Sequence, residues 1–212
     1  MIRNYFSLLW KIISRPTVFF RTLGADPTSF SLSFALSFAI ITRWLGASMG
    51  FIWTQFIGDV TALFESSIPS GMPVLLPPMF KERMAEWFLG VGPVILDPFL
   101  TLLSLLFTSL IIFAGARILI TPGEDHPEKI SYETVLKVLC FGTAPAIFAA
   151  LPLFGAPLAR FCTLIATVIG FKTVYRIGTG RALMVFLFPN LLFIGIIGVG
   201  LFAIAALVLQ FL

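Results

Sequence analysis

Between Ala182 and Phe211 the sequence contains no charged residue and is almost entirely apolar. An α-helix rises 1.5 Å per residue, so a helix of about 20 such residues crosses the roughly 30 Å of hydrocarbon in a bilayer. Four earlier stretches are also long and apolar enough to cross. The five spans that the sequence predicts lie near residues 30–53, 93–119, 132–154, 157–175 and 182–211.

The composition of the 212 residues agrees with a lipid environment. Hydrophobic residues make up 58% of the chain and charged residues only 11%, against about 25% charged in soluble domains. Lipid offers no partners to backbone N–H and C=O groups, and the runs lack the alternation of a membrane barrel. The predicted fold is therefore all-α, a polytopic membrane helical bundle of five transmembrane helices formed by residues 29–212. The modest net charge of +4 does not indicate nucleic-acid binding.

Residues 2–15 are too few and too charged to cross a bilayer, but they are periodic. On a helix of about 100° per residue the polar side chains share one arc and the apolar ones fill the rest. The pattern predicts an amphipathic helix at the membrane interface, ended by Pro16, within a cytoplasmic lead-in of residues 1–28. Its basic face favours anionic headgroups of the lipid bilayer. The residues expected to bind the membrane surface are Arg3, Lys11, Arg15 and Trp10.

The lysines and arginines beside the spans predict the orientation. With the N-terminus inside, ten of them lie on the cytoplasmic side and three outside, which favours five crossings with the C-terminus outside. The link from Leu153 to Pro157 is so short that the third and fourth spans must form a tight antiparallel hairpin. Charged residues interrupt the long connection of residues 54–92, and we expect two short surface helices there.

Arg43 lies near the middle of the first span, where a permanent cation is costly. Its neighbours at helical spacing are mostly small, including Gly46 and Gly50, so we expect Arg43 to face other helices. Asp97, near the outer start of the second span, is within reach of it. The sequence therefore predicts an Arg43–Asp97 ion pair in the outer half of the bundle, with or without Arg160 of the fourth span.

Other polar residues recur at helical spacing in the second and fourth spans and form polar stripes. Two interpretations stay open. A buried charge pair and its hydroxyl neighbours can fix the register of the helices, or they can mark a pathway for a substrate, an ion or a lipid. The residues of this candidate intramembrane polar site are Arg43, Asp97, Thr101, Ser104, Thr108, Arg160, Thr163 and Thr167.

Proline residues predict helix kinks at Pro145 in the third span and at Pro189-Asn190 in the fifth, because proline leaves a carbonyl without its donor. These kinks either shape the packing or act as hinges. No catalytic motif or cofactor signature is present, and the lone His126 has no second histidine or cysteine near it. We therefore expect no enzymatic activity, no cofactor and no metal site.

Several stretches resemble a known membrane family. They are the lead-in SLLWKIISRPTVFFRTL, the start of the second span ILDPFLTLLSLL, the Ala-Pro within YETVLKVLCFGTAPAIF, and the Gly-x-Gly-Arg-Ala before the fifth span. Together they resemble the Yip domain, the five-span module of the Ypt/Rab-interacting membrane proteins and their prokaryotic relatives. The resemblance covers nearly the whole chain. It implies a cytosolic N-terminus, five helices and no enzymatic activity.

The resemblance also bears on partners and location. In eukaryotic members it implies roles in vesicle traffic and binding of prenylated small GTPases. This sequence lacks the hydrophilic N-terminal extension of those members and keeps only Leu96-Asp97-Pro98 of an Asp-Leu-Tyr-Gly-Pro-like element, which argues against GTPase binding. The sequence fits better a compact prokaryotic relative in the cytoplasmic (inner) membrane.

Two functions are consistent with these features. The first is a non-enzymatic protein that organises membrane or partner proteins through its helix surfaces, as a homo-oligomer or with a membrane-protein partner. The second is a transporter, channel or lipid-moving protein that uses the polar seam around Arg43 and Asp97. A hydrated cavity lined by the polar residues would favour transport, whereas a dry interior with an apolar face between protomers would favour the organiser.

Overall fold

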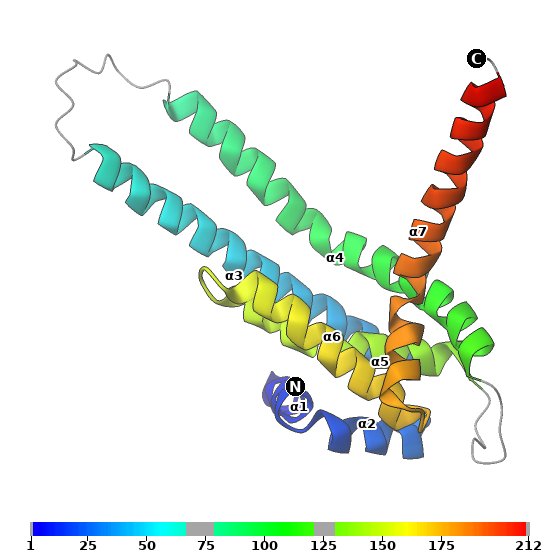
Figure 1. Ribbon diagram of the computed structural model, residues 1–212. Helices are drawn as coiled ribbons and strands as arrows, with labels where there is room; N and C mark the ends of the chain where they lie inside the picture. The colour runs from blue at the N-terminus through cyan, green and yellow to red at the C-terminus, as the bar shows by residue number, and fades with distance from the viewer. Residues whose placement is uncertain (1, 67–78, 121–129, 211–212) are drawn as a thin grey trace.

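Helices form the whole architecture of the described chain (Figure 1). The computed structural model describes residues 2–66, 79–120 and 130–210, with side chains for 5–56, 91–120 and 130–200, and these residues contain no strand. The elements are α1 (Ile2–Ser14), α2 (Pro16–Ala25), η1 (Pro27–Ser29), α3 (Leu32–Ser66), α4 (Met79–Leu119), α5 (Tyr132–Gly142), η2 (Ala144–Ala150), α6 (Gly155–Val174) and α7 (Thr179–Gln210), where η denotes a 3-10 helix.

Five helical segments are long and apolar enough to cross a membrane, which confirms the predicted number. The third of them joins α5 to η2, and a turn at residues 151–154 leads directly into α6. η2 packs against α6, so the expected tight hairpin is present. The five segments are Leu32–Phe56, Val91–Leu119, Tyr132–Ala150, Gly155–Val174 and Thr179–Gly200.

The connection between the first two spans differs from the prediction. α3 continues to Ser66 and α4 already begins at Met79, so the helical parts of residues 54–92 extend the spanning helices. The prediction of separate surface helices is therefore wrong. Extending an existing helix adds one hydrogen bond per residue without the cost of a new nucleus, and single charges do not stop it. Pro93 and Pro98 both lie inside α4.

Pro16 and Pro145 have different effects on the helices that contain them. Pro16 stands in the first turn of α2, where a proline gives up no helical hydrogen bond, and α2 is a helix that the sequence analysis did not predict. In the third span α5 ends at Gly142 and a 3-10 helix begins at Ala144, so Pro145 accompanies a change of helix type rather than a simple kink.

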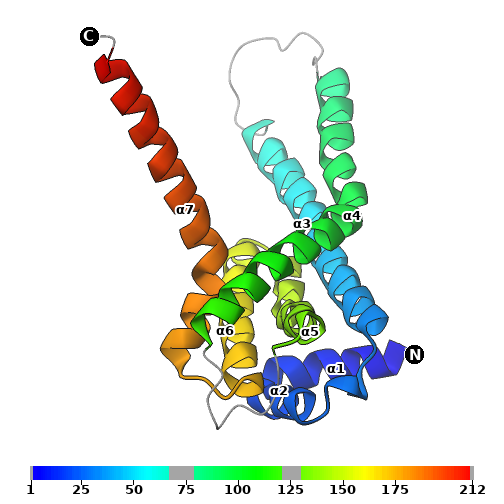
Figure 2. The ribbon, with the colours of Figure 1, turned by 90° about the vertical axis from the view of Figure 1, so that its right-hand side faces the viewer.

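The core lies around α5. About 67% of the third candidate span is buried, against 11% of the fifth. The ring of Phe141 lies 5.1 Å from that of Phe19, 5.3 Å from that of Phe30 and 5.5 Å from that of Phe38, measured between centroids. Figure 2 shows α1 and α2 lying across the end of the bundle, beneath α5 and α6. The lead-in is thus part of the packed structure.

The last helix leaves this core. Figures 1 and 2 show the C-terminal half of α7 projecting away from the bundle on a course of its own. Every residue from Asn190 to Gly200 is exposed. α7 runs through Pro189 as one continuous helix, with its buried residues Ala182 and Val185 in the first half. A long apolar surface therefore has no partner among the described residues.

Candidate functional site

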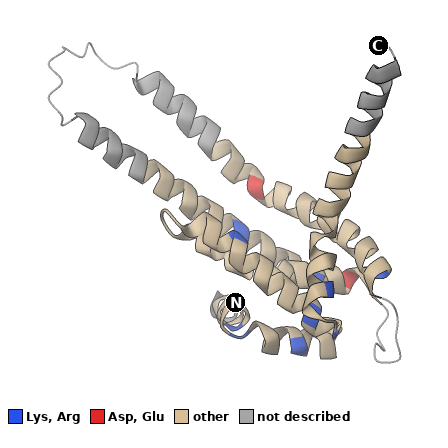
Figure 3. Cartoon of the chain, viewed as in Figure 1, with Lys and Arg blue, Asp and Glu red and all other residues tan. Residues whose placement is uncertain are grey.

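The structure brings Arg43 of α3 and Asp97 of α4 together. Arg43 Nη2 lies 3.9 Å from Asp97 Oδ1, and the two side chains are 42% and 21% exposed. Figure 3 shows that most of the described basic residues gather instead at the end of the bundle where α1, α2 and the α6–α7 connection lie. The pair joins two consecutive helices through residues that are 54 positions apart in the sequence.

A second contact, beside the ion pair, compensates for the helical hydrogen bond that is missing because a proline follows Asp97. Pro98 has no N–H, so the carbonyl of Val94, four residues earlier in α4, lacks its usual helical donor. Trp44, the neighbour of Arg43 in α3, donates its indole N–H to that carbonyl over 3.1 Å. The α3–α4 clasp, which we define as Arg43, Trp44, Val94, Asp97 and Thr101, thus uses a proline-freed carbonyl as well as a charge pair.

Thr101 completes the clasp. Its hydroxyl donates to Asp97 Oδ2 over 3.3 Å, and the residue is 1% exposed. Asp97 therefore receives a hydrogen bond from its own helix and faces a cation on the neighbouring one. Such an arrangement can fix the register of two helices, and it offers no nucleophile–base pair for catalysis.

The rest of the predicted stripe on α4 does not face the core. Ser104 is exposed and Thr108 only partly buried. The buried face of α4 includes Ser109, which is fully buried, lies 2.9 Å from the hydroxyl of Tyr132 and donates to the carbonyl of Leu106. The predicted stripe therefore coincides with the buried face of α4 only in part. The buried residues of α4 are Thr101, Leu105, Ser109, Ile112, Gly115 and Ala116.

The predicted stripe on α6 lies elsewhere. Arg160 is exposed and makes no ion pair with Asp97 or with any other described carboxylate, so it is not the second cationic partner. Thr163 is partly buried, and its carbonyl accepts a hydrogen bond of 2.8 Å from Thr167. Thr167 packs against Gly142 of α5 so closely that a Cβ on Gly142 would clash with its hydroxyl. Thr167 therefore belongs to the α5–α6 contact.

One ionic contact was missed by the sequence analysis. Lys137 of α5 is 2% exposed, and its Nζ lies 2.7 Å from Glu133 Oε1 and donates over 2.7 Å to the carbonyl of Pro27. The Glu-x-x-x-Lys spacing could have indicated the pair. Hydrogen bonds from Thr28 lower the pKa of the nearby Asp26 carboxyl, and the charge of Lys137 adds to this effect. The cluster ties the lead-in to the central helix.

The N-terminal helix α1 divides its apolar residues between two environments. Leu9 and Ile12 are buried against the bundle, while Trp10 is 70% exposed beside the exposed Lys11. The hydroxyl of Tyr5 bonds to that of Thr42 in α3 over 2.7 Å. Arg15 is exposed after the end of α1, and the side chain of Arg3 lies outside the described ones. Part of the face predicted to meet lipid therefore docks onto protein.

Metal binding has no support among the described side chains, which include no cluster of three or more His, Cys, Asp or Glu residues suited to an ion. His126 lies outside the described residues. Cys140 is buried and Cys162 partly buried, and both are free thiols.

The fold and the clasp define the class of this protein: an all-helical chain with five helices long and apolar enough to span a membrane. Comparisons with models of protein families, with curated proteins and with solved structures found no match to the chain. The resemblance to the Yip domain accordingly stays a prediction from the residues quoted above.

Proposed function

We propose that this chain is a non-enzymatic integral membrane protein of the Yip type, which organises membrane or partner proteins through the surfaces of its helices. It crosses the cytoplasmic membrane of a prokaryote five times, with the N-terminus inside and the C-terminus outside. The five candidate spans and the gathering of basic side chains at one end of the bundle support this placement (Figure 3).

The observation that carries the proposal is the exposure of Asn190. This residue lies halfway along the fifth candidate span of 22 residues and is exposed, without a hydrogen bond to any described side chain. An amide in hydrocarbon without a partner costs several kcal/mol. Amide side chains in membrane helices accordingly associate with other helices. Asn190 therefore requires a partner from outside this chain.

The α7 helix of a second copy of the chain offers such a partner, because its own Asn190 can both donate and accept a hydrogen bond. At 100° per residue, Phe193 and Ile197 share the Asn190 face, and both are exposed. A carboxamide is at once a donor and an acceptor, so two Asn190 side chains related by a two-fold axis satisfy each other. The apolar residues around them pack on their counterparts. We infer a homodimer through this face of α7.

The N-terminal helix gives the assembly a second surface. Phe6 and Trp10 lie one helical turn apart on α1 and are 53% and 70% exposed, beside the exposed cation of Lys11. Aromatic rings next to a cation suit the headgroup region of an anionic leaflet. We propose that α1 lies along the inner leaflet with these residues toward lipid and with Leu9 and Ile12 toward the bundle.

The transporter remains the alternative, and the packing of the clasp argues against it. Thr101 is 1% exposed and Trp44 closes the gap to the backbone of α4, so the polar groups satisfy one another instead of lining a channel. Vesicles that hold the wild type, Arg43→Ala or Asp97→Asn should all show background ion flux and lipid scrambling. Flux in the wild type that either variant abolished would overturn the organiser in favour of transport.

Self-association is tested by energy transfer between donor- and acceptor-labelled copies in vesicles, measured as the protein is diluted with lipid. Asn190→Leu should weaken the dimer about 5- to 30-fold, which corresponds to about 1–2 kcal/mol for the amide contact. Asn190→Gln keeps the amide and should retain most of the affinity. Leu192→Ala, on the opposite face of α7, is the matched control and should leave the transfer unchanged. Equal transfer in the wild type and Asn190→Leu would refute the proposed interface.

A further inference from the structure

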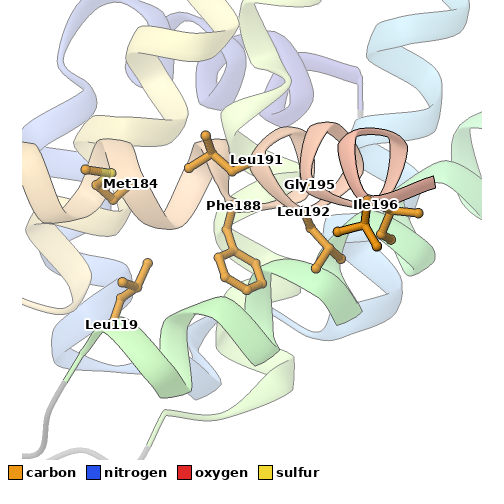
Figure 4. Close-up of a pocket in the computed structure, with 8 residues that line it drawn as sticks. Leu119, Met184, Phe188, Leu191, Leu192, Gly195 and Ile196 are labelled. Atoms are coloured by element: carbon orange, nitrogen blue, oxygen red, sulfur yellow. The ribbon is translucent and has the colours of Figure 1, made fainter. Parts of the chain in front are cut away.

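An apolar groove lies between the end of α4 and one face of α7 (Figure 4). It has a volume of about 670 Å³. Figure 4 shows Phe188 projecting from α7 toward α4, with Leu119 at the end of α4 beside it. No charged side chain lines the groove. Its walls are Leu119 of α4 and Met184, Phe188, Leu191, Leu192, Gly195, Ile196 and Val199 of α7.

Two glycines shape this groove. Phe188 packs onto Gly115 of α4, where a Cβ would lie 2.5 Å from the Cγ of the ring, so the two helices meet closely there. Beyond that contact α7 diverges from α4 (Figure 1). Gly195, two turns further along, has open space where a Cβ would stand. The two helices therefore meet at Phe188 and lie further apart along the projecting half of α7.

Arg181 stands at the inner end of the same face. It precedes Phe188 by seven residues, as Phe188 precedes Gly195, and this spacing places the three on one side of the helix. Arg181 is exposed. From residue 134 to the end the sequence contains no acidic residue but five cations, Lys137, Arg160, Lys172, Arg176 and Arg181. Arg181 thus lies beyond the inner end of the groove, on the side of α7 that lines it.

The dimensions fit a lipid chain better than a helix. From Met184 to Val199 the face is about 22 Å long, which exceeds the roughly 15 Å of hydrocarbon in one leaflet. A helix about 10 Å wide would need roughly 1,700 Å³ over that length, more than the roughly 1110 Å³ of empty space between the walls. One acyl chain, in contrast, is thin enough to lie along it.

We propose that the groove binds one acyl chain of an anionic phospholipid of the inner leaflet, with Arg181 binding the phosphate of the headgroup. The inference rests on the proposed membrane placement, because it sets Arg181 at the inner headgroup level. It does not depend on the α7 dimer, whose face around Asn190 lies on the other side of the helix. The lipid fills the space that α7 leaves as it diverges from α4.

Native mass spectrometry of the purified full chain tests this site. The protein is titrated with phosphatidylglycerol, with phosphatidylcholine of the same chains, and with glycerol phosphate, which has the anion but no chain. We expect tight binding of phosphatidylglycerol, weaker binding of phosphatidylcholine and none of glycerol phosphate. If glycerol phosphate bound as well as phosphatidylglycerol, or if the two lipids bound equally, the proposed site would be wrong.

Matched variants distinguish the contribution of the acyl chain to lipid binding from that of the headgroup. Arg181→Gln should weaken the binding of phosphatidylglycerol about fivefold and leave the binding of phosphatidylcholine unchanged. Arg160→Gln should change the binding of neither lipid. Gly195→Leu fills the groove and should weaken both lipids at least tenfold. Gly200→Leu, also in open space but on the Asn190 side of α7, should weaken the binding of neither lipid. Full binding by Gly195→Leu, or an equal loss in Gly200→Leu, would overturn the assignment. Energy transfer in Gly195→Leu should match that of the wild type, so failure of the lipid site is distinguishable from failure of the dimer.

Discussion

The contact between α3 and η2 depends on Gly46 having no side chain. An ideal Cβ there would lie 2.5 Å from the carbonyl oxygen of Ala146 and 3.3 Å from its carbonyl carbon. Carbon and oxygen atoms normally approach to about 3.3 Å, so Gly46→Ala requires a shift of about 0.8 Å. The obstacle is backbone inside a 3-10 helix, which cannot rotate away as a flexible side chain could. Overpacking of this kind costs about 1–3 kcal/mol.

Helix propensity partly offsets that cost, because alanine is about 1 kcal/mol better than glycine in a helix. We therefore expect Gly46→Ala to lower the free energy of unfolding by about 0–2 kcal/mol, which is about 1–3 kcal/mol below a glycine-to-alanine change in open space, measured by titrating the detergent-solubilised protein with a denaturing detergent. Gly198→Ala, which meets no atom within 4 Å, is the control and should be neutral or stabilising. If Gly46→Ala were as stable as Gly198→Ala, the close approach of α3 to η2 would be refuted.

Three further predictions concern the polar contacts. A double-mutant cycle with Arg43→Gln and Asp97→Asn should give a coupling of about 0.5–1 kcal/mol, discounted because Arg43 is 42% exposed, and no coupling would contradict the clasp. Lys137→Met leaves a carbonyl without its donor and should lower the free energy of unfolding by about 1–2 kcal/mol in the same titration; wild-type stability would contradict the anchor. Burial raises the pKa of Tyr5 above its ordinary 10.0, so its bond to Thr42 should stabilise α1 fully below about pH 10 and be lost as the pH rises further. Tyr5→Phe should remove that pH dependence, measured by hydrogen exchange of α1, and an unchanged profile would exclude Tyr5 as its source.

The number and type of the helices could be predicted from the sequence, because a 20-residue apolar run in lipid has few alternatives to a helix. The ends of helices could not. The predicted span of residues 93–119 agrees with the candidate span Val91–Leu119, yet the helix that contains it, α4, begins at Met79 and continues through Pro93. A proline weakens a helix by one donor, and here Trp44 supplies a donor to the carbonyl that Pro98 leaves free. Such compensation comes from another helix and is invisible in local sequence.

The polar residues show the same limit. The pairing of Arg43 with Asp97 could be predicted from the free-energy cost of an unpaired charge in a membrane span, because the spans contain few residues of opposite charge. The side chains around them could not be assigned, because spacings of three and four residues both satisfy a helical face. The sequence predicts Ser104 in the polar stripe with Asp97, but Ser104 is exposed, whereas Ser109, outside that stripe, is buried. Which side of a helix faces the core is determined by the helices that pack against it.

Membrane placement is tested most directly by labelling single cysteines from each side of the membrane. Phe154, in the turn before α6, is 75% exposed, and Gly178, in the connection after α6, is exposed with nothing packed against its Cα. In intact cells an impermeant maleimide should label Phe154→Cys from outside, and should reach Gly178→Cys only after permeabilisation, with the wild type as the blank for Cys140 and Cys162. Labelling of both positions from the same side would contradict a membrane-spanning α6 and the five-span organiser built on it.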